Sequence, residues 1–298
     1  MDTFIRITTI FKSWNFLIAI AFLGLLFGCN ETSLGEAVET PSNFIYVAHT
    51  RLDDNRGIYS KIYDIDFSQY EMTLLGGDLA ANSFSNPEII AHLDSVFDVK
   101  SERTLWSIGN HDNTSEARFL KTTLKPKFHS YKAHDVTFIT LDSQDSLSSI
   151  VNDQKDFLMT ALDSVTTSTV LIMTHKLIFM NGHPVMDAAI ETVCNGRRGD
   201  CFHCHNPNNF QAEIAPRLKE LQERGVQVIV VGGDLGYKQS SFEYVDPSGI
   251  VYLGNGIWYP KDWNSALIFS KLPQKPMIYS FVAIDSLIKS QDSLMNSL

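Results

Sequence analysis

Cysteine is scarce in this sequence, with four residues among 298. So few cysteines cannot build a fold from disulfides, and a hydrophobic core must therefore hold the chain together. Positive charge is also in short supply, because 24 Lys and Arg face 34 Asp and Glu, for a net charge of -10. Since no basic stripe is concentrated anywhere along the chain, nucleic acid is not expected as a partner.

Glycine and proline are not enriched either, at 17 and 10 residues, which excludes a collagen-like or low-complexity chain. Hydrophobic residues make up 44% of the sequence and charged residues 19%, a balance that excludes disorder for most of it. A chain of this length can form one large domain, or two small ones, with a sizeable core.

An apolar run near the N-terminus, from Phe16 to Phe27, contains no charge and follows Arg6 and Lys12. This pattern is typical of a signal peptide. The run of about a dozen residues is shorter than the roughly 20 that a membrane-spanning helix needs. An uncleaved anchor and a chance hydrophobic segment are the alternatives.

The apolar run ends in Leu26-Phe27-Gly28-Cys29, which resembles the lipobox of bacterial lipoproteins. The resemblance implies that residues 1–28 are removed and that Cys29 is lipidated. Residues 29–42 are polar and are expected to act as a tether. The protein is therefore expected to be exported and lipid-anchored to a bacterial membrane in the cell envelope.

From Phe44 onward, short apolar runs alternate with amphipathic segments, which predicts an α/β domain from 43 to 285. The expected strands are Phe44–Ala48, Met72–Leu75, Thr104–Ile108, Val136–Leu141, Thr169–Thr174, Val226–Val231, Ile250–Leu253 and Met277–Ile284. The expected helices are Pro87–Phe97, Asp153–Val165 and Asn209–Arg224. The tail 286–298 is expected to be a frayed appendage or a short helix.

Polar side chains follow four of these strands at the point where each strand ends. They are Asp78, then Asn110-His111-Asp112, then His175, and finally Asp234. Ligands of open α/β sheets bind outside the carboxyl ends of the strands. Carboxylate, amide and imidazole groups suit a divalent transition metal, or a mixed pair of hard and borderline ions.

The strings Gly77-Asp78 and Gly109-Asn110-His111-Asp112 resemble the second and third sequence blocks of the calcineurin-like metallophosphoesterases. The resemblance extends from Phe44 to about Asp285. It implies that family's fold, a four-layer α-β-β-α sandwich with two central sheets between layers of helices. It also implies the family's two metal ions, which polarise a phosphate group and generate the attacking hydroxide.

Residue by residue, the resemblance assigns Asp78 to the bridging aspartate, Asn110 to the asparagine ligand and His175 to the lone histidine ligand. It assigns His111 to the group that protonates the leaving group, oriented by Asp112. These five positions match the family pattern fully.

The first and last blocks depart from that pattern. The first should contain Asp-x-His after the strand, whereas this chain has His49-Thr50-Arg51. The last should contain Gly-His-x-His, whereas this chain has Gly233-Asp234-Leu235-Gly236. His49 and Asp234 can still bind a metal, but Arg51 is a permanent cation and Gly236 has no side chain.

These departures bear on the number of ions. By the family's division of ligands, one metal site would keep Asp78, Asn110, His175 and Asp234, whereas the other would keep only His49 and a share of Asp78. Because Arg51 would repel an ion beside it, one divalent ion (Mn, Fe or Zn) is expected. Two ions in an altered site, or no functional ion, are the alternatives. Arg51 itself would either clamp phosphate oxygens or form an ordinary salt bridge.

The three remaining cysteines, Cys194, Cys201 and Cys204, lie within an expected insertion from 180 to 208. A disulfide suits an exported protein and leaves one cysteine free. A zinc site with one histidine has suitable ligand types. The string Cys201 to His205 also matches the pattern for covalent haem attachment. The disulfide is favoured, and the sequence leaves all three open.

Taken together, the motifs predict a metal-dependent hydrolase of phosphate mono- or diesters, with water as nucleophile and His111 as general acid. The expected partners are a small-molecule or envelope phosphate ester and, through the lipid, a membrane. The intact His111-Asp112 pair favours an enzyme. The altered first and last blocks favour the alternative, a non-catalytic protein that binds phosphate compounds on the same fold.

Overall fold

The computed structural model describes residues 40–52, 57–197 and 206–295. The chain divides into two units, Met1–Val38 and Glu39–Leu298, and the described residues all belong to the second unit. The expected signal peptide, Cys29 and most of the expected tether therefore lie outside the described residues. None of the helices in the described ranges combines the length and hydrophobicity needed to span a bilayer.

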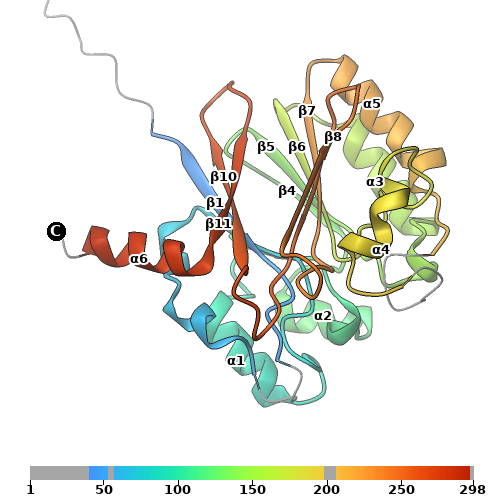
Figure 1. Ribbon diagram of the computed structural model, residues 1–298. Coiled ribbons are helices and arrows are strands. Elements are labelled where there is room, and N and C mark those ends of the chain that lie inside the picture. Colours follow the sequence, from blue (N-terminus) through green and yellow to red (C-terminus); the bar gives the residue numbers. More distant parts are fainter. Residues whose placement is uncertain (1–39, 53–56, 198–205, 296–298) are drawn as a thin grey trace, which may run out of the picture. The chain divides into compact units, whose positions relative to one another are not determined.

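Two mixed β-sheets form the centre of the fold (Figure 1). The first has the order β11 (Ile278–Ala283), β10 (Ser265–Lys271), β1 (Ser42–Val47), β2 (Met72–Leu75) and β3 (Thr104–Trp106). The second has the order β4 (His129–Ala133), β5 (Val136–Thr140), β6 (Thr169–Thr174), β7 (Gln227–Gly232), β9 (Val251–Asn255) and β8 (Ser241–Val245). The strands β1, β2 and β3 run parallel, as do β5, β6, β7 and β9.

Helices cover the outer face of each sheet. They are α1 (Pro87–Phe97), α2 (Glu116–Thr123), α3 (Asn152–Asp163), α4 (Ile190–Val193), α5 (Ala215–Glu223) and α6 (Ile284–Met295). The helices α1, α2 and α6 pack in one core cluster with the first sheet, and α3, α4 and α5 pack in another with the second sheet.

The alternation of side chains along β1 shows why these layers form. Phe44 and Tyr46 pack in the core between the two sheets, whereas Ile45 and Val47 pack on the outer face. Successive side chains of a strand point to opposite faces, so a strand buried on both faces must be apolar at every position. The expected four-layer α-β-β-α sandwich is confirmed.

All eight expected strands are present, and three further strands of the described chain, β4, β8 and β10, were not predicted. The expected helix from 209 to 224 begins with a π-helical turn, Phe210–Ile214, before α5. Pro216 lies in the first turn of α5, and proline is tolerated there because it has no N–H to donate.

The C-terminal segment is a helix, α6, rather than a frayed appendage. Its residues Ile284 and Leu287 are buried against the first sheet's outer face. Gln291 accepts a hydrogen bond from the backbone N–H of Asp66 and donates one to its carbonyl, at 3.0 and 3.2 Å. The helix therefore packs as part of the folded unit.

A buried lysine links the two sheets. The ammonium of Lys271, at the end of β10, donates to the carboxylate of Asp135 at 3.1 Å and to the hydroxyl of Ser168 at 2.9 Å. The Lys271 side chain is fully buried. Asp135 and Ser168 flank strands of the second sheet, so this contact fixes the two sheets together at one corner.

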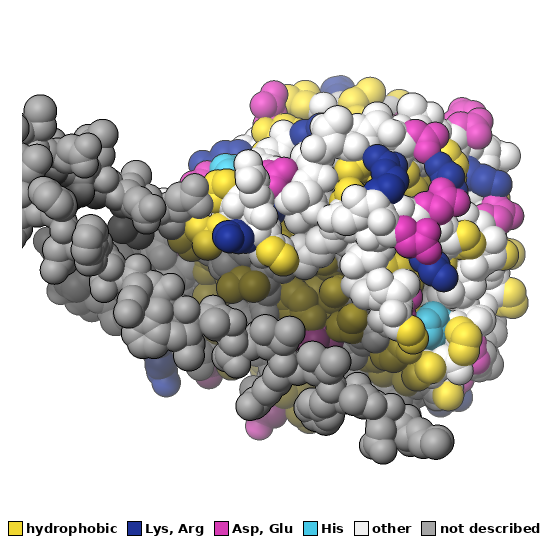
Figure 2. Space-filling model, turned by 90° about the horizontal axis from the view of Figure 1, so that it is seen from above, with side chains coloured by type: hydrophobic (Ala, Val, Ile, Leu, Met, Phe, Trp, Pro, Cys, Tyr) yellow, Lys and Arg dark blue, Asp and Glu magenta, His cyan; other side chains and the backbone are white. Residues whose placement is uncertain are grey.

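The surface seen from above (Figure 2) carries acidic and basic side chains interspersed with apolar ones. On this face, the described residues gather no charge of a single sign.

Candidate active site

The loops that follow β1, β2, β3, β6 and β7 meet at one end of the two sheets, which is the lower end in Figure 1. Backbone hydrogen bonds join them. His49 N donates to Gly77 O at 2.8 Å, and Asp234 N donates to His175 O at 2.9 Å. The strand ends that the sequence singled out are therefore brought to one place.

Two glycines allow these loops to approach each other so closely. Gly77 has a φ of +89°, and a side chain there would lie 2.7 Å from His175 Nδ1. A Cβ at Gly109 would lie 2.0 Å from Asp78 Oδ1. Any residue other than glycine at either position would displace the polar side chains of the site.

Asp78 lies at the centre of the cluster. Its Oδ1 atom is 3.6 Å from Nε2 of His175, and its Oδ2 atom is 3.7 Å from Nε2 of His49 and 4.0 Å from Nε2 of His111. Asp78 and His49 both have a positive φ, at 53° and 55°. Such strain costs free energy, is held by the surrounding structure, and is concentrated at functional sites.

The three histidines share one hydrogen-bonding arrangement. Nδ1 of His49 bonds to the Ile257 carbonyl at 3.0 Å, Nδ1 of His175 to the Gly76 carbonyl at 2.7 Å, and Nδ1 of His111 to the Ala81 carbonyl at 2.5 Å. A carbonyl accepts only, so Nδ1 of each histidine carries a proton, and Nε2 of each ring lies on the side of Asp78. Metal-binding histidines are held in this way.

Two potential metal-ligand atoms of the site are buried without a hydrogen bond. Within the described part of the chain, Nε2 of His175 and Oδ1 of Asn110 are buried and have no hydrogen-bond partner. A buried polar atom without a partner is costly and calls for a ligand, an ion or a water molecule. Both atoms are of the kinds that bind divalent ions.

The charge of His49 is set by its surroundings. Burial lowers the pKa of His49 to about 4, although the charge of Asp78 raises it. The imidazole is therefore neutral at pH 7. A neutral imidazole can donate its lone pair to an ion.

Arg51 places a permanent positive charge beside the Asp78 carboxylate. Its Nε atom is 3.7 Å from Asp78 Oδ2, and its side chain is only 12% exposed. Its guanidinium carbon lies 5.3 Å from the centre of the Trp258 ring. The ring and the carboxylate hold this charge at the edge of the site.

Asp112 has a different role from the expected one. Its carboxylate accepts from the backbone of Asp78 at 2.5 Å and of Gly109 at 3.0 Å, and from the hydroxyl of Ser83. Burial and the charge of Asp78 raise the pKa of Asp112 to about 6, although the hydrogen bonds from Ser83 and Gly109 act to lower it. Asp112 thus fixes the turn at Asp78. The residue that orients His111 is Ala81, through its carbonyl, and not Asp112.

Asp234 is held by a residue that sequence analysis missed. The side-chain amide of Asn195 donates to Asp234 Oδ1 at 3.0 Å and to the Leu235 carbonyl at 3.1 Å. Oδ1 of Asn195 accepts from the backbone of Tyr237 at 3.0 Å. Asn195 stands one residue after Cys194 in the chain, and no local motif connects it with Asp234.

A cavity of about 610 Å³ opens onto the site. Its lining comprises His49, Arg51, Asp78, Asn82, Asn110, His111, Asn195, Tyr237 and Trp258. Four of these residues, Asn82, Asn195, Tyr237 and Trp258, were not predicted. They lie in loops without a recognisable sequence signature, and only the folded chain brings them to the cavity.

The expected disulfide or zinc role does not appear for Cys194. This residue is a free cysteine that is fully buried in the core beside the second sheet. Its sulfur lies 3.7 Å from that of Met180, so it acts as an apolar core residue. Cys201 and Cys204 lie outside the described residues.

The donor atoms around Asp78 fit a divalent ion in kind. Atoms that share one ion at about 2.0–2.2 Å lie roughly 3–3.6 Å apart, and His175 Nε2 and Asp78 Oδ1 are separated by 3.6 Å. The described residues contain no group of three or more His, Cys, Asp or Glu that could hold an ion as they stand. Binding would therefore draw these side chains closer together.

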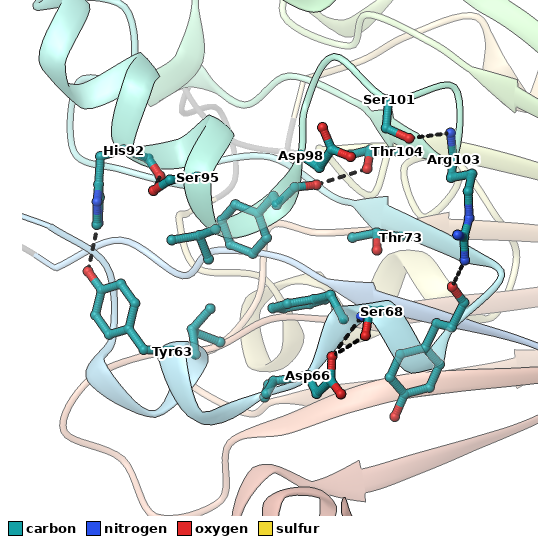
Figure 3. A pocket seen from close by; sticks show the side chains of 16 residues that line it. Tyr63, Asp66, Ser68, Thr73, His92, Ser95, Asp98, Ser101, Arg103 and Thr104 are labelled. Carbon is teal, nitrogen blue, oxygen red and sulfur yellow. Dashed lines mark hydrogen bonds between the residues drawn. The ribbon is translucent and has the colours of Figure 1, made fainter.

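A second cavity, of about 600 Å³, lies beside α1 and the starts of β2 and β3 (Figure 3). Several of its polar side chains form hydrogen bonds with neighbouring residues of the cavity lining. Tyr63 bonds to His92 at 2.8 Å, Asp66 accepts from Ser68, and Thr104 donates to the Phe97 carbonyl. The cluster around Asp78 is thus the better candidate for chemistry.

A comparison with solved structures finds a similar fold in a dimetal phosphatase from Danio rerio. The TM-score is 0.52 at 15% identity, over 82% of this chain and 97% of that one. The chain has a metallophosphoesterase fold. The match confirms the fold that the Gly-Asn-His-Asp string implied, and it covers nearly the whole of the phosphatase.

Two further solved structures are less similar to this chain. PhoD has a TM-score of 0.47 at 8% identity, over 81% of this chain and 68% of that one. The phosphopantetheinyl hydrolase PptH from Mycobacterium tuberculosis has a TM-score of 0.44 at 10% identity, over 80% and 98%. No protein-family model matches the sequence, and no curated protein matches it either.

Proposed function

We propose that this protein hydrolyses phosphate mono- or diesters at the cluster around Asp78. The observation that carries the proposal is the arrangement of one buried carboxylate with three imidazole Nε2 atoms at 3.6–4.0 Å and a guanidinium at 3.7 Å. Such a cluster combines groups that bind an anion, hold an ion and transfer a proton.

Asp78, Asn110, His175 and Asp234 would hold one divalent transition ion, Mn, Fe or Zn. The buried and unpartnered atoms of Asn110 and His175 support this assignment. When bound, such an ion polarises the phosphate group and lowers the pKa of a water molecule. One ion is proposed rather than two, because Arg51 places a fixed positive charge beside Asp78.

Arg51 binds the phosphate group in this proposal. Its side chain is held between Asp78 and the Trp258 ring, so little rotamer freedom is lost when it bonds to a phosphate oxygen. Negative charge grows on the phosphate oxygens as the leaving group departs. A positioned guanidinium stabilises that charge.

His111 delivers the proton to the leaving group. Its Nδ1–H donates a hydrogen bond to the Ala81 carbonyl, which leaves Nε2 to face the cavity. The imidazolium form carries a second proton on Nε2 and donates it to the departing oxygen. His111 is partly exposed to the cavity, with 32% of its side chain accessible.

The test uses the full-length chain, freed of metal and then loaded with Mn, Fe or Zn in turn. Hydrolysis of a nitrophenyl phosphate, an alkyl phosphate and a phosphodiester is measured as kcat/KM. We expect turnover of at least one ester class and a loss of about 10²-fold in Arg51→Ala. Arg217→Ala, at an exposed surface ion pair, is the matched control and should leave kcat/KM unchanged.

A second candidate function is phosphate binding without turnover. The replacement of a family ligand by Arg51 favours it, because the first ion would then be missing from an otherwise similar pocket. Binding of phosphate esters that depends on Arg51, with no hydrolysis under any of the three ions, would establish this function instead.

We also propose that the protein is exported and attached to a membrane through a lipid on Cys29. The uncharged run Phe16–Phe27 and the string Leu26-Phe27-Gly28-Cys29 support the proposal. The first described strand begins at Ser42, so residues 30–41 separate the lipid from the folded unit.

A further inference from the structure

Aromatic side chains form one wall of the cavity that opens onto Asp78. Tyr237 and Trp258 both line it. Tyr237 is 51% exposed, and the neighbouring Trp263 is 45% exposed. Burying a large aromatic ring is favourable, so a ring left half in water beside a polar site can gain free energy by contact with a ligand. We name Tyr237 and Trp258, which line the cavity, together with the neighbouring Trp263, which does not, the aromatic wall.

The aromatic wall contacts two residues of the site, His49 and Arg51, through Trp258. Trp258 stacks on His49 with the ring centres 4.9 Å apart and the planes 22° from parallel. It also lies 5.3 Å from the guanidinium carbon of Arg51. The Tyr237 ring meets Trp258 edge-on, with 5.1 Å between centres. A ligand bound at Arg51 would therefore have an aromatic surface immediately beside it.

Hydrogen bonds to backbone groups of the surrounding loops hold the aromatic wall in place. Asn264 accepts from the N–H of Trp258 at 2.9 Å and donates to the carbonyl of Lys261 at 2.9 Å. The indole N–H of Trp263 donates to the Gly236 carbonyl at 3.2 Å. The ammonium of Lys261 lies over the rings of Trp263 and Tyr237, at 4.6 and 5.7 Å. The rings are thus pre-positioned, and little entropy is lost when a ligand contacts them.

We propose that the aromatic wall binds a flat aromatic ring carried by the esterified alcohol of the substrate. A nucleotide has such a ring, because its nucleobase is joined to the phosphate through a sugar. Rings of this kind stack on tyrosine and tryptophan whatever their hydrogen-bonding pattern, with a gain of about 5- to 100-fold in affinity. The inference rests on the proposed function, because it assigns a substrate class to the same site.

The test compares two substrates with the same leaving group. Adenosine 5′-phosphate and ribose 5-phosphate both release a primary alkoxide, so any difference between them comes from the base. With the metal-loaded full-length chain we expect kcat/KM to be at least about 10-fold higher for the adenosine compound. In Tyr237→Ala this ratio should fall toward one, and Tyr237→Phe should restore it. Tyr63→Ala, at an exposed tyrosine beside the second cavity, should leave the ratio as it is.

A second pair of substrates, 2-phenylethyl phosphate and ethyl phosphate, separates a nucleobase from any flat ring. A preference within both pairs supports a general ring site, and a preference within the first pair alone supports a nucleobase site. Equal kcat/KM within both pairs, or a ratio unchanged in both Tyr237→Ala and Trp258→Ala, would overturn the inference while hydrolysis itself stands.

Tryptophan fluorescence keeps the inference testable if no ester is hydrolysed. Adenosine 5′-phosphate should quench the emission of the wild-type chain, whereas ribose 5-phosphate should not. In Tyr237→Ala, the concentration of adenosine 5′-phosphate that gives half of the quenching should rise at least about 5-fold. That result would retain the ring site and reject the hydrolase. No quenching and no hydrolysis would reject both.

Discussion

Nε2 of His175 lies 3.6 Å from Oδ1 of Asp78, although the two residues follow strands of different sheets. Asp78 comes after β2 of the first sheet and His175 after β6 of the second. The site therefore exists only when the two sheets are packed face to face. The core between the sheets includes Phe44, Phe138 and Phe269. Packing in this core thus positions the polar groups at the end of the sheets.

His111→Ala should impair hydrolysis according to the leaving group. An alkoxide needs a proton as it departs, so we expect a loss of about 10²–10⁴-fold in kcat for an alkyl phosphate. A nitrophenolate leaves without help, and the same variant should lose far less with a nitrophenyl ester. Steady-state kinetics on both esters measures this, and His92→Ala, at a histidine beside the second cavity, is the control. Equal losses on both esters would exclude His111 as the proton donor.

Asp112→Ala should destabilise the fold as well as the site. The substitution leaves the N–H groups of Asp78 and Gly109 and the hydroxyl of Ser83 without their buried acceptor. We expect a loss of at least about 3 kcal/mol in the free energy of unfolding, because each unsatisfied buried donor costs about 1–3 kcal/mol. Urea denaturation measures it. His111→Ala should change stability by less than about 1 kcal/mol, and similar losses in the two variants would contradict the assigned role.

Asp135→Asn should weaken the link between the sheets and remove a pH dependence. Burial acts to raise the pKa of Asp135, but hydrogen bonds from Ser168 and the charge of Lys271 outweigh it and lower the pKa to about 2. A carboxyl whose pKa is lower in the folded state stabilises the fold above its unfolded pKa. That stability is lost as the pH falls from about 4 toward 2.

The variant should be less stable at pH 7 by about 1–3 kcal/mol, because the buried Lys271 ammonium loses its counter-charge. Between pH 4 and pH 2 its stability should fall less steeply than that of the wild type. Thermal unfolding across this range measures both effects. Asp156→Asn, at an exposed position, should behave as the wild type. An unchanged slope in Asp135→Asn would show that the Lys271 contact is not the cause.

The sequence predicted the central strands because they are buried on both faces and appear as continuous apolar runs. It missed β4 and β8, which lie at the edges of the second sheet, where polar side chains alternate with apolar ones. It also missed β10, although the run Ala266–Phe269 carried a signal. Edge strands pack on one side only, so their composition resembles that of loops.

The residues around Asp78 could be found because each follows a strand in a recognisable string. Asn195, Tyr237 and Trp258 could not, because they reach the cavity through long-range contacts such as that between Asn195 and Asp234. The role of Asp112 differs from the expected one for a related reason. The resemblance placed it beside His111, whereas the folded turn directs its carboxylate to the backbone of Asp78.

Cys29→Ala should abolish lipid attachment. Full-length protein made in a bacterium with radiolabelled palmitate should carry label and sediment with membranes, because residues 1–29 have the pattern of a lipoprotein signal. The variant should carry no label, whereas Cys194→Ala, at a cysteine buried in the core, should be labelled as the wild type is. Unlabelled, unprocessed wild-type protein in the soluble fraction would contradict the proposal.

In the proposed function, one divalent ion and Arg51 act together in the hydrolysis of phosphate esters at Asp78. The most direct test is a titration of the metal-free, full-length protein with Mn²⁺, at a protein concentration far above the dissociation constant, while the rate of nitrophenyl phosphate hydrolysis is recorded. The rate should rise in proportion to added ion and stop rising at one equivalent per chain, and His175→Ala should show no rise. A break at two equivalents, or no hydrolysis at any ratio, would contradict the claim.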